Sequence, residues 1–287
     1  EQKVLRRLAV IAGPISLPAA EAITGATPSI LRALADKSMI VVPEMGRYGL
    51  HCLMRAFALE RLLEAGELPD AQEAHFHYFV NWIESKLPEL REVNQRLALQ
   101  QIAEEIGNIR AAWRYGIENA TAGHLTSLMD GIYQFCIART WYAMGLELSA
   151  VSKAALARRG LNGVLGQLVI NEGFMHHHLG NYDQAGYCAE EGRLLCERER
   201  DNCGVARALF LSSTVHYDSN HYDQAEHLLI ESFNLNRGLG NWEAVADLHL
   251  FLGHIIDYRT IYAPEGEARH KPTCSFEFEH ERPTAAQ

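Results

Sequence analysis

Histidine is the residue type in this sequence that first suggests chemistry, because the chain of 287 residues carries 14 of them. Three are consecutive at 176–178, and two flank a phenylalanine at 75–77. Neighbouring residues of a helix point about 100° apart and residues two apart also diverge, so neither run can aim its imidazoles at one metal ion. His176 and His216 occupy equivalent positions of a sequence repeat, which favours a packing role for both. The sequence predicts no metal site.

The sequence also contains no group of residues that is arranged as a catalytic site would require. His51 and Cys52 are adjacent, which is the wrong geometry for a nucleophile and its base on a rigid backbone. The glycine-rich stretch GLNGVLGQ at 160–167 lacks the Gly-Lys-Ser/Thr end of a phosphate-binding loop. We therefore expect that this chain is not an enzyme and that it carries no cofactor of its own.

Charge and composition restrict the possible partners. The net charge is −10, and residues 67–262 hold 25 Asp/Glu against 15 Lys/Arg. An acidic body repels phosphate backbones, and no apolar run reaches the roughly 20 residues of a membrane span. The six cysteines show neither CxxC nor zinc-type spacing, which indicates reduced thiols and a cytoplasmic protein. The opening EQKVLRRLAVIAG is already amphipathic and lacks an initiating Met, which indicates a piece of a longer protein.

A repeat with a 40-residue period organises the second half of the chain. The tetrapeptide YDQA occurs at 182–185 and again at 222–225. Small residues follow the first three tyrosines of this register at fixed distances, as expected where two helices of a hairpin cross closely. The tyrosines are Tyr142, Tyr182, Tyr222 and Tyr262, and the small residues are Gly145, Ala185, Ala225, Ser152, Gly192 and Ser232. In the fourth unit Glu265 and Pro272 replace the small residues, so the repeat decays there.

The remaining sequence predicts a mainly all-α fold with a small β-hairpin near its N-terminus. Helix signals at 3–11, 17–24, 28–38 and 52–66 surround two short strands, MIVV and YGLH, which is the outline of a winged helix. We predict a winged-helix domain at 1–66, a helical connector at 67–120, an α-solenoid of helical hairpins at 121–262, and an irregular or disordered tail at 263–287.

Three stretches resemble the STAND class of signal-transducing nucleotide-switch ATPases. They are LRRLAVIAGPISLPAAEAI at 5–23, RYGLHCLMRAFALERL at 47–62 and EEIGNIRAAWRYGIE at 104–118. Their order matches the winged helix and following helix of that class, which includes the bacterial LuxR- and AfsR-like regulators and the NB-ARC ATPases. In that family tetratricopeptide-like repeats follow, as the repeat units do here. The resemblance implies the sensor arm of a bacterial signalling or transcriptional regulator.

The resemblance also implies a nucleotide contact. In the family a motif histidine reaches the β-phosphate of bound ADP, and the matching residue is His51. This chain departs from the motif because Cys52 stands where the family has an acidic residue. ATP or ADP would belong to a nucleotide domain that this chain does not contain.

By similarity to tetratricopeptide repeats, the first helix of each hairpin should line a groove that binds a protein or peptide. The predicted groove residues are Gln167, Ile170, Phe174, His177, His178, Arg207, Phe210, Thr214, Tyr217, Asp218, Asp247, Leu250, His254, Asp257 and Tyr258. Their aromatic, charged and hydrogen-bonding side chains suit protein recognition.

Two other functions remain open at this point. The chain could be a stand-alone repeat adaptor, or a DNA-binding regulator whose recognition helix PSILRALADKS offers only Arg32 and Lys37 as basic residues. The truncated fourth hairpin should also leave apolar surface near Leu248, Phe251 and Leu252, which would favour self-association.

Overall fold

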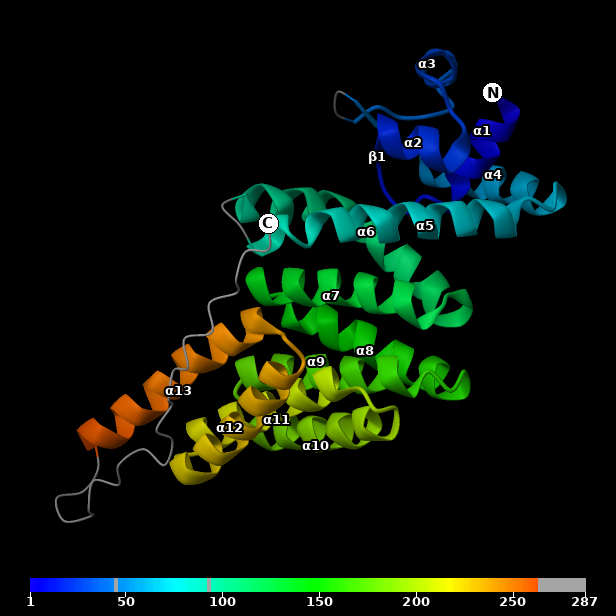
Figure 1. Ribbon diagram of the computed structural model, residues 1–287. Coiled ribbons are helices and arrows are strands. Elements are labelled where there is room, and N and C mark those ends of the chain that lie inside the picture. Colours follow the sequence, from blue (N-terminus) through cyan, green and yellow to red (C-terminus); the bar gives the residue numbers. More distant parts are fainter. Residues whose placement is uncertain (44–45, 92–93, 263–287) are drawn as a thin grey trace, which may run out of the picture.

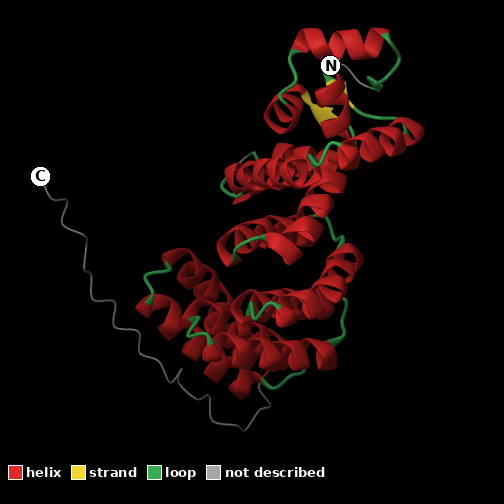
Figure 2. Ribbon diagram, turned by 90° about the vertical axis from the view of Figure 1, so that its right-hand side faces the viewer, coloured by secondary structure: helices red, strands yellow, loops and turns green. Residues whose placement is uncertain are grey.

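The protein is an elongated stack of helices with a small sheet near its N-terminus, as Figures 1 and 2 show for the computed structural model. The structure describes residues 1–43, 46–91 and 94–262, so the predicted tail at 263–287 lies outside the described residues. The mainly all-α fold predicted from the sequence is confirmed. The first elements are α1 (Gln2–Arg7), η1 (Leu8–Val10), β1 (Ile15–Ser16), α2 (Leu17–Thr24), α3 (Pro28–Asp36), β2 (Arg47–Tyr48) and α4 (Cys52–Glu64).

The short helices of this N-terminal unit begin and end at residues that favour helix boundaries. Thr27 precedes α3, and its side chain accepts a hydrogen bond from the Ile30 N–H at 3.4 Å. Ser16 precedes α2, but its side chain makes no capping hydrogen bond. Gly25 ends α2 with φ of 71°, a left-handed conformation that glycine adopts without strain.

The sheet pairs differently from the predicted hairpin. The predicted strand MIVV contributes only an isolated bridge from Val41 to Gly49. The second strand instead pairs with residues that precede α2: Ile15 faces Tyr48 and Ser16 faces Arg47, in antiparallel register. A strand of two residues has no alternating pattern, so the sequence could not reveal it.

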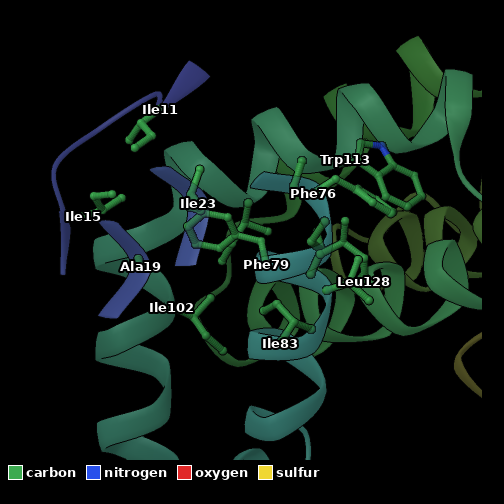
Figure 3. Close-up of a cluster of buried hydrophobic side chains, with 14 of the residues drawn as sticks. Ile11, Ile15, Ala19, Ile23, Phe76, Phe79, Ile83, Ile102, Trp113 and Leu128 are labelled. Carbon is green, nitrogen blue, oxygen red and sulfur yellow. The ribbon is translucent and has the colours of Figure 1, made fainter. Parts of the chain in front are cut away.

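A continuous apolar core joins the N-terminal unit to the connector, which consists of α5 (Leu68–Lys86), η2 (Glu89–Arg91) and α6 (Gln95–Asn119). Figure 3 shows that Ile23 from α2, Phe79 from α5 and Ile102 from α6 belong to one cluster. One face of each connector helix is apolar and buried. Its buried residues include Phe76, Phe79, Val80, Ile83, Ile102, Ile109, Trp113 and Ile117.

The period of the repeat arises from helices of uniform length. The helices are α7 (Ala122–Ala138), α8 (Tyr142–Arg158), α9 (Asn162–His178), α10 (Tyr182–Arg198), α11 (Asn202–Asp218), α12 (Tyr222–Gly238) and α13 (Trp242–Tyr262). From α7 to α12 each has 17 residues and is followed by a three-residue turn. The second residue of each turn has positive φ, and these residues recur at a constant spacing: Thr140, Gly160, Gly180, Arg200, Asn220 and Gly240.

The predicted small residues are buried where the helices cross. Ala185, Ala225 and Ser152 are 0% exposed and Ser232 is 1% exposed. A Cβ on Gly192 would lie 2.5 Å from Ile170 Cγ1, so the crossing of α9 and α10 requires glycine there. The tyrosine register marks the starts of α8, α10 and α12, but Tyr262 instead ends the longer α13.

One expectation about the last helix is wrong. Leu248 and Leu252 were predicted to be exposed, but they are 3% and 7% exposed because they pack with Phe233 of α12. Phe251 is half-buried. Among the α13 side chains that the structure describes, the large apolar ones that are exposed are Trp242 and Leu250.

Candidate functional site

The first helices of the hairpins form an inner layer, because α7 contacts α9 and α9 contacts α11. Each of these helices and α13 contributes one aromatic side chain to a row that crosses the layer. Ring centroids lie 6.1 Å apart from Tyr133 to Phe174, 5.9 Å from Phe174 to Phe210, and 5.6 Å from Phe210 to Phe251. These four residues are called the aromatic row. Three of them are half-buried and therefore retain surface that a partner could contact.

Arg207 of α11 lies against one end of the aromatic row. Its guanidinium lies 5.6 Å from the centre of the Tyr133 ring and donates a hydrogen bond to Asn171 Oδ1 at 2.6 Å. Burial raises the pKa of the Tyr133 hydroxyl, and the nearby Arg207 charge offsets only part of that shift. The arginine is thus held in a fixed position by contacts with two inner helices.

A second cluster lies where the inner helices end. His177 Nε2 of α9 and Asp218 Oδ2 of α11 are 2.6 Å apart, which ties two successive hairpins together. The next residue, His178, stacks on Tyr142 with an interplanar angle of 6° and a centroid distance of 5.3 Å. The pKa of His178 is lowered by burial and by the neighbouring His177. These contacts assign His177 and His178 to links between helices.

The predicted groove residues divide into three groups in the structure. Ile170 and Thr214 are buried and Phe174 is nearly so, so these three serve mainly packing. The half-buried residues are Gln167, His177, Arg207, Phe210 and Tyr217, and the exposed ones are His178, Asp218, Asp247 and Leu250. The side chains of His254, Asp257 and Tyr258 lie outside the described residues.

Sequence reasoning missed several residues of this face. Tyr133, Asn171 and Phe251 contact predicted groove residues but were absent from the prediction. Gln167 also donates a hydrogen bond to Asp201 Oδ2 at 2.7 Å. Tyr133 and Phe251 do not stand at the repeat positions of Phe174 or Phe210, so the repeat register could not find them. The signal that could have found them is an aromatic residue on each first helix.

The predicted nucleotide contact and the predicted DNA contacts belong to the N-terminal unit. His51 is exposed at the N-cap of α4, and its Nδ1 lies 3.5 Å from Cys52 Sγ. On α3, Arg32 is exposed, but Lys37 forms an ion pair with Glu1. That pairing leaves this helix with little free positive charge for DNA phosphates.

A buried polar network joins the N-terminal unit to α6. Asn108 Oδ1 accepts hydrogen bonds from the N–H groups of Ala12 at 2.8 Å and Gly13 at 3.2 Å. Asn108 Nδ2 donates to Glu105 Oε2 at 2.8 Å, and Glu105 Oε1 forms an ion pair with Arg47 of β2 at 2.8 Å. Burial raises the pKa of the Glu105 carboxyl, which Asn108 and Arg47 partly oppose. The network connects both segments of the sheet region to one helix.

We expect Asn108→Ala to destabilise the junction by about 2 kcal/mol, because it removes the acceptor of the Ala12 and Gly13 N–H groups and one hydrogen bond to the buried Glu105 carboxyl. Hydrogen exchange should become faster at residues 11–16 and remain unchanged in α10 and α12. Asn119→Ala is the matched control, since Asn119 is exposed and donates only to the Tyr115 carbonyl. Equal exchange rates in the two variants would contradict a structural role for the network.

A small cavity lies next to the aromatic row but does not offer a ligand site. It has a volume of about 20 Å³ and is lined by Trp113, Met129, Tyr133, Ser149 and Asn171 among others. A cavity of this size holds about one water molecule. Within the described residues, no three His, Cys, Asp or Glu side chains are grouped to hold a metal ion. No described helix is both long and apolar enough to cross a membrane.

Comparisons with known proteins give a match among solved structures. No family model matches the chain, and no curated protein does. The chain is similar to a Signal Transduction ATPase with Numerous Domains (STAND) protein with a tetratricopeptide repeat sensor, from Pyrococcus horikoshii. The match has a TM-score of 0.41 and 12% sequence identity, and it covers 93% of this chain and 57% of that one. This chain therefore spans little more than half the length of the protein it resembles.

Proposed function

We propose that this chain is the sensor arm of a bacterial STAND-type signalling or transcriptional regulator, which binds a protein or peptide through the face formed by its first helices. The observation that carries the proposal is the aromatic row with Arg207 beside it. Aromatic and arginine side chains dominate the binding energy of protein interfaces. A row that crosses four helices suits an extended segment of polypeptide.

The charge of the repeats indicates the chemistry of that segment. Residues 67–262 are acidic overall, and Asp218 and Asp247 are exposed at predicted groove positions. A partner with apolar anchors for the aromatic row and with flanking Lys or Arg residues would complement this face. Nucleic acid would be repelled by the same charge.

Transmission to the N-terminal unit is part of the proposal. The Asn108 network fixes that unit to α6, and α6 continues directly into the repeats through α7. Binding that favours one arrangement of the repeats would therefore shift the position of the N-terminal unit. His51, exposed at the start of α4, would then hold or release the phosphate of ADP bound to a separate nucleotide domain. The chain itself would act as a binding module and not as an enzyme.

The test is a selection of displayed random peptides against the whole chain, followed by affinity measurements. We expect the selected peptides to bind about 30-fold more weakly to Phe210→Ala, because a buried aromatic contact in an interface is worth about 2 kcal/mol. Tyr187→Ala is the control, since Tyr187 is an aromatic residue of the outer helix α10 that is 72% exposed. It should leave the affinity unchanged.

Circular dichroism of both variants shows whether they retain the helical fold. Peptides that bind Phe210→Ala as tightly as the unmodified chain would place the binding face elsewhere and contradict the proposal. Peptides that lose affinity only for Tyr187→Ala would assign binding to the outer helices.

A further inference from the structure

Helix α13 exposes a face that the other first helices bury. Trp242 and Leu250 are 66% and 71% exposed, and Ala246 and Gly253 between and after them are also exposed. Within the described residues, which end at 262, no second helix follows α13 to cover this face. The preceding hairpins show what such a face normally contacts.

The hairpin of α9 and α10 closes through two pairs of small residues. Gly166 and Gly173 are seven residues apart on α9, and Ala185 and Gly192 are seven apart on α10. A Cβ on Gly192 would lie 3.1 Å from the Gly166 carbonyl oxygen, and a Cβ on Gly173 would lie 3.3 Å from that of Ala185. The two helices thus cross in antiparallel register with small residues facing each other.

The hairpin of α11 and α12 follows the same rule at equivalent positions. Ser232 Oγ donates a hydrogen bond to the Ala206 carbonyl at 2.7 Å, and Ser213 Oγ donates to the Ala225 carbonyl at 2.8 Å. Again both helices carry their small residues seven apart. A spacing of seven residues is two helical turns, so the residues lie on one face of each helix.

Helix α13 carries this pattern once more, with Ala246 and Gly253 seven residues apart. In antiparallel register the pattern is complementary to itself, because each small residue meets the other one on a second copy. We propose that this face is an interface between two copies of the chain, in which Ala246 lies against the partner's Gly253 and Gly253 against the partner's Ala246. The exposed Leu250 then lies close to the two-fold axis and is buried by the contact.

The small residues of the repeat register do not recur in the sequence that follows α13. The second helix of each preceding hairpin has two small residues at the crossing: Ala185 and Gly192 in α10, and Ala225 and Ser232 in α12. The corresponding residues of the fourth unit are Glu265 and Pro272. Proline inside a helix costs about 3 kcal/mol and a glutamate at a close crossing would not fit. A second copy of α13 offers small residues where the register of the fourth unit has Glu265 and Pro272.

Charge selects the antiparallel orientation over the parallel one. Glu243 and Asp247 both lie in the N-terminal half of α13. A parallel pair would place each carboxylate beside the same carboxylate of the second copy. An antiparallel pair separates them and also opposes the two helix dipoles.

The first experiment measures the mass of the whole chain by sedimentation equilibrium at micromolar concentration. We expect twice the monomer mass of 32.2 kDa. Gly253→Arg should give the monomer mass, because a Cβ on Gly253 meets nothing within 4 Å among the described residues but would meet the second copy. Gly186→Arg is the matched control, since Gly186 is also in a helix with no neighbour within 4 Å, and it should remain a dimer.

A second experiment tests the register. In a chain whose Cys52, Cys203 and Cys274 are replaced by serine, Ala246→Cys and Gly253→Cys variants are mixed and oxidised. A disulfide between them should form in the mixture, and neither variant should crosslink with itself, because equivalent positions lie about 10 Å apart along antiparallel helices.

A monomeric unmodified chain would overturn the proposal, and so would a Gly253→Arg variant that remains a dimer. A chain that becomes dimeric only after deletion of 263–287 would show that its own C-terminal segment covers the face, and this also overturns the proposal. Since Ala246 and Gly253 are not part of the aromatic row, these outcomes are independent of peptide binding.

Discussion

Replacing Trp113 with alanine should lower the free energy of unfolding by about 3–5 kcal/mol, the range for removing a large buried aromatic side chain. Trp113 is 1% exposed, and its indole N–H donates a hydrogen bond to Ser152 Oγ of α8 at 2.8 Å. The side chain therefore joins the connector helix α6 to the first repeat. Its loss removes apolar contacts and leaves a cavity at the point where the repeats attach. Urea denaturation followed by circular dichroism measures the effect.

Trp113→Phe distinguishes the loss of apolar contacts from the loss of the hydrogen bond, and Tyr187→Ala is a control. Trp113→Phe keeps most of the apolar volume and loses the hydrogen bond, so we expect a smaller loss of about 1–2 kcal/mol. Tyr187→Ala, which removes an exposed aromatic residue, should change stability by no more than about 0.5 kcal/mol. A loss below about 1 kcal/mol for Trp113→Ala would contradict the buried role of this residue.

The second large effect is on the pH dependence of stability. Burial lowers the pKa of His75 from 6.5 to about 4, and the nearby Asn108 side chain opposes only part of this shift. Below pH 6.5 the unfolded chain takes up a proton at this position while the folded chain does not. The free energy of unfolding should therefore fall by about 3 kcal/mol in total as the pH is lowered from 6.5 to 4, and His75 should contribute nothing above that range.

The His75→Leu variant isolates this contribution. The raised pKa of Glu105 gives the opposite slope, since the folded chain then binds the proton more readily, but this carboxyl is present in both proteins. The difference between the two profiles should grow below pH 6.5 in favour of the variant. His227→Leu is the control, because His227 is exposed on α12. Parallel profiles for the unmodified chain and His75→Leu would contradict burial of a neutral imidazole.

The repeats were predictable from the sequence because their period has a simple physical origin. Each helix and the short turn after it form one unit of constant length, and two such units separate successive tyrosines of the register. The small residues of the register are buried as predicted because close helix crossings exclude larger side chains. The predicted pairing of the two strands is present only at the Val41–Gly49 bridge, and β1 was missed because Ile15–Ser16 is too short to show a pattern.

The candidate site was predictable only in part. Phe210 and Arg207 follow from the register, but Tyr133 and Phe251 do not, because they stand at other positions of the repeat than Phe210 does. Ile170 was assigned to the groove but is buried against α10. Whether a side chain is buried depends on the helix that packs against it. The position of a residue in the repeat does not describe that neighbouring helix. The roles of His51 and of the aromatic row stay predictions.

The most direct measurement of the central claim is photo-crosslinking of a selected peptide to the chain. Benzoylphenylalanine is placed at position 210 in the aromatic row and, separately, at position 187 on the outer helix. If the first helices form the binding face, the peptide crosslinks through position 210 and not through position 187. Crosslinking through position 187 alone would contradict the assignment of the binding face to the inner layer.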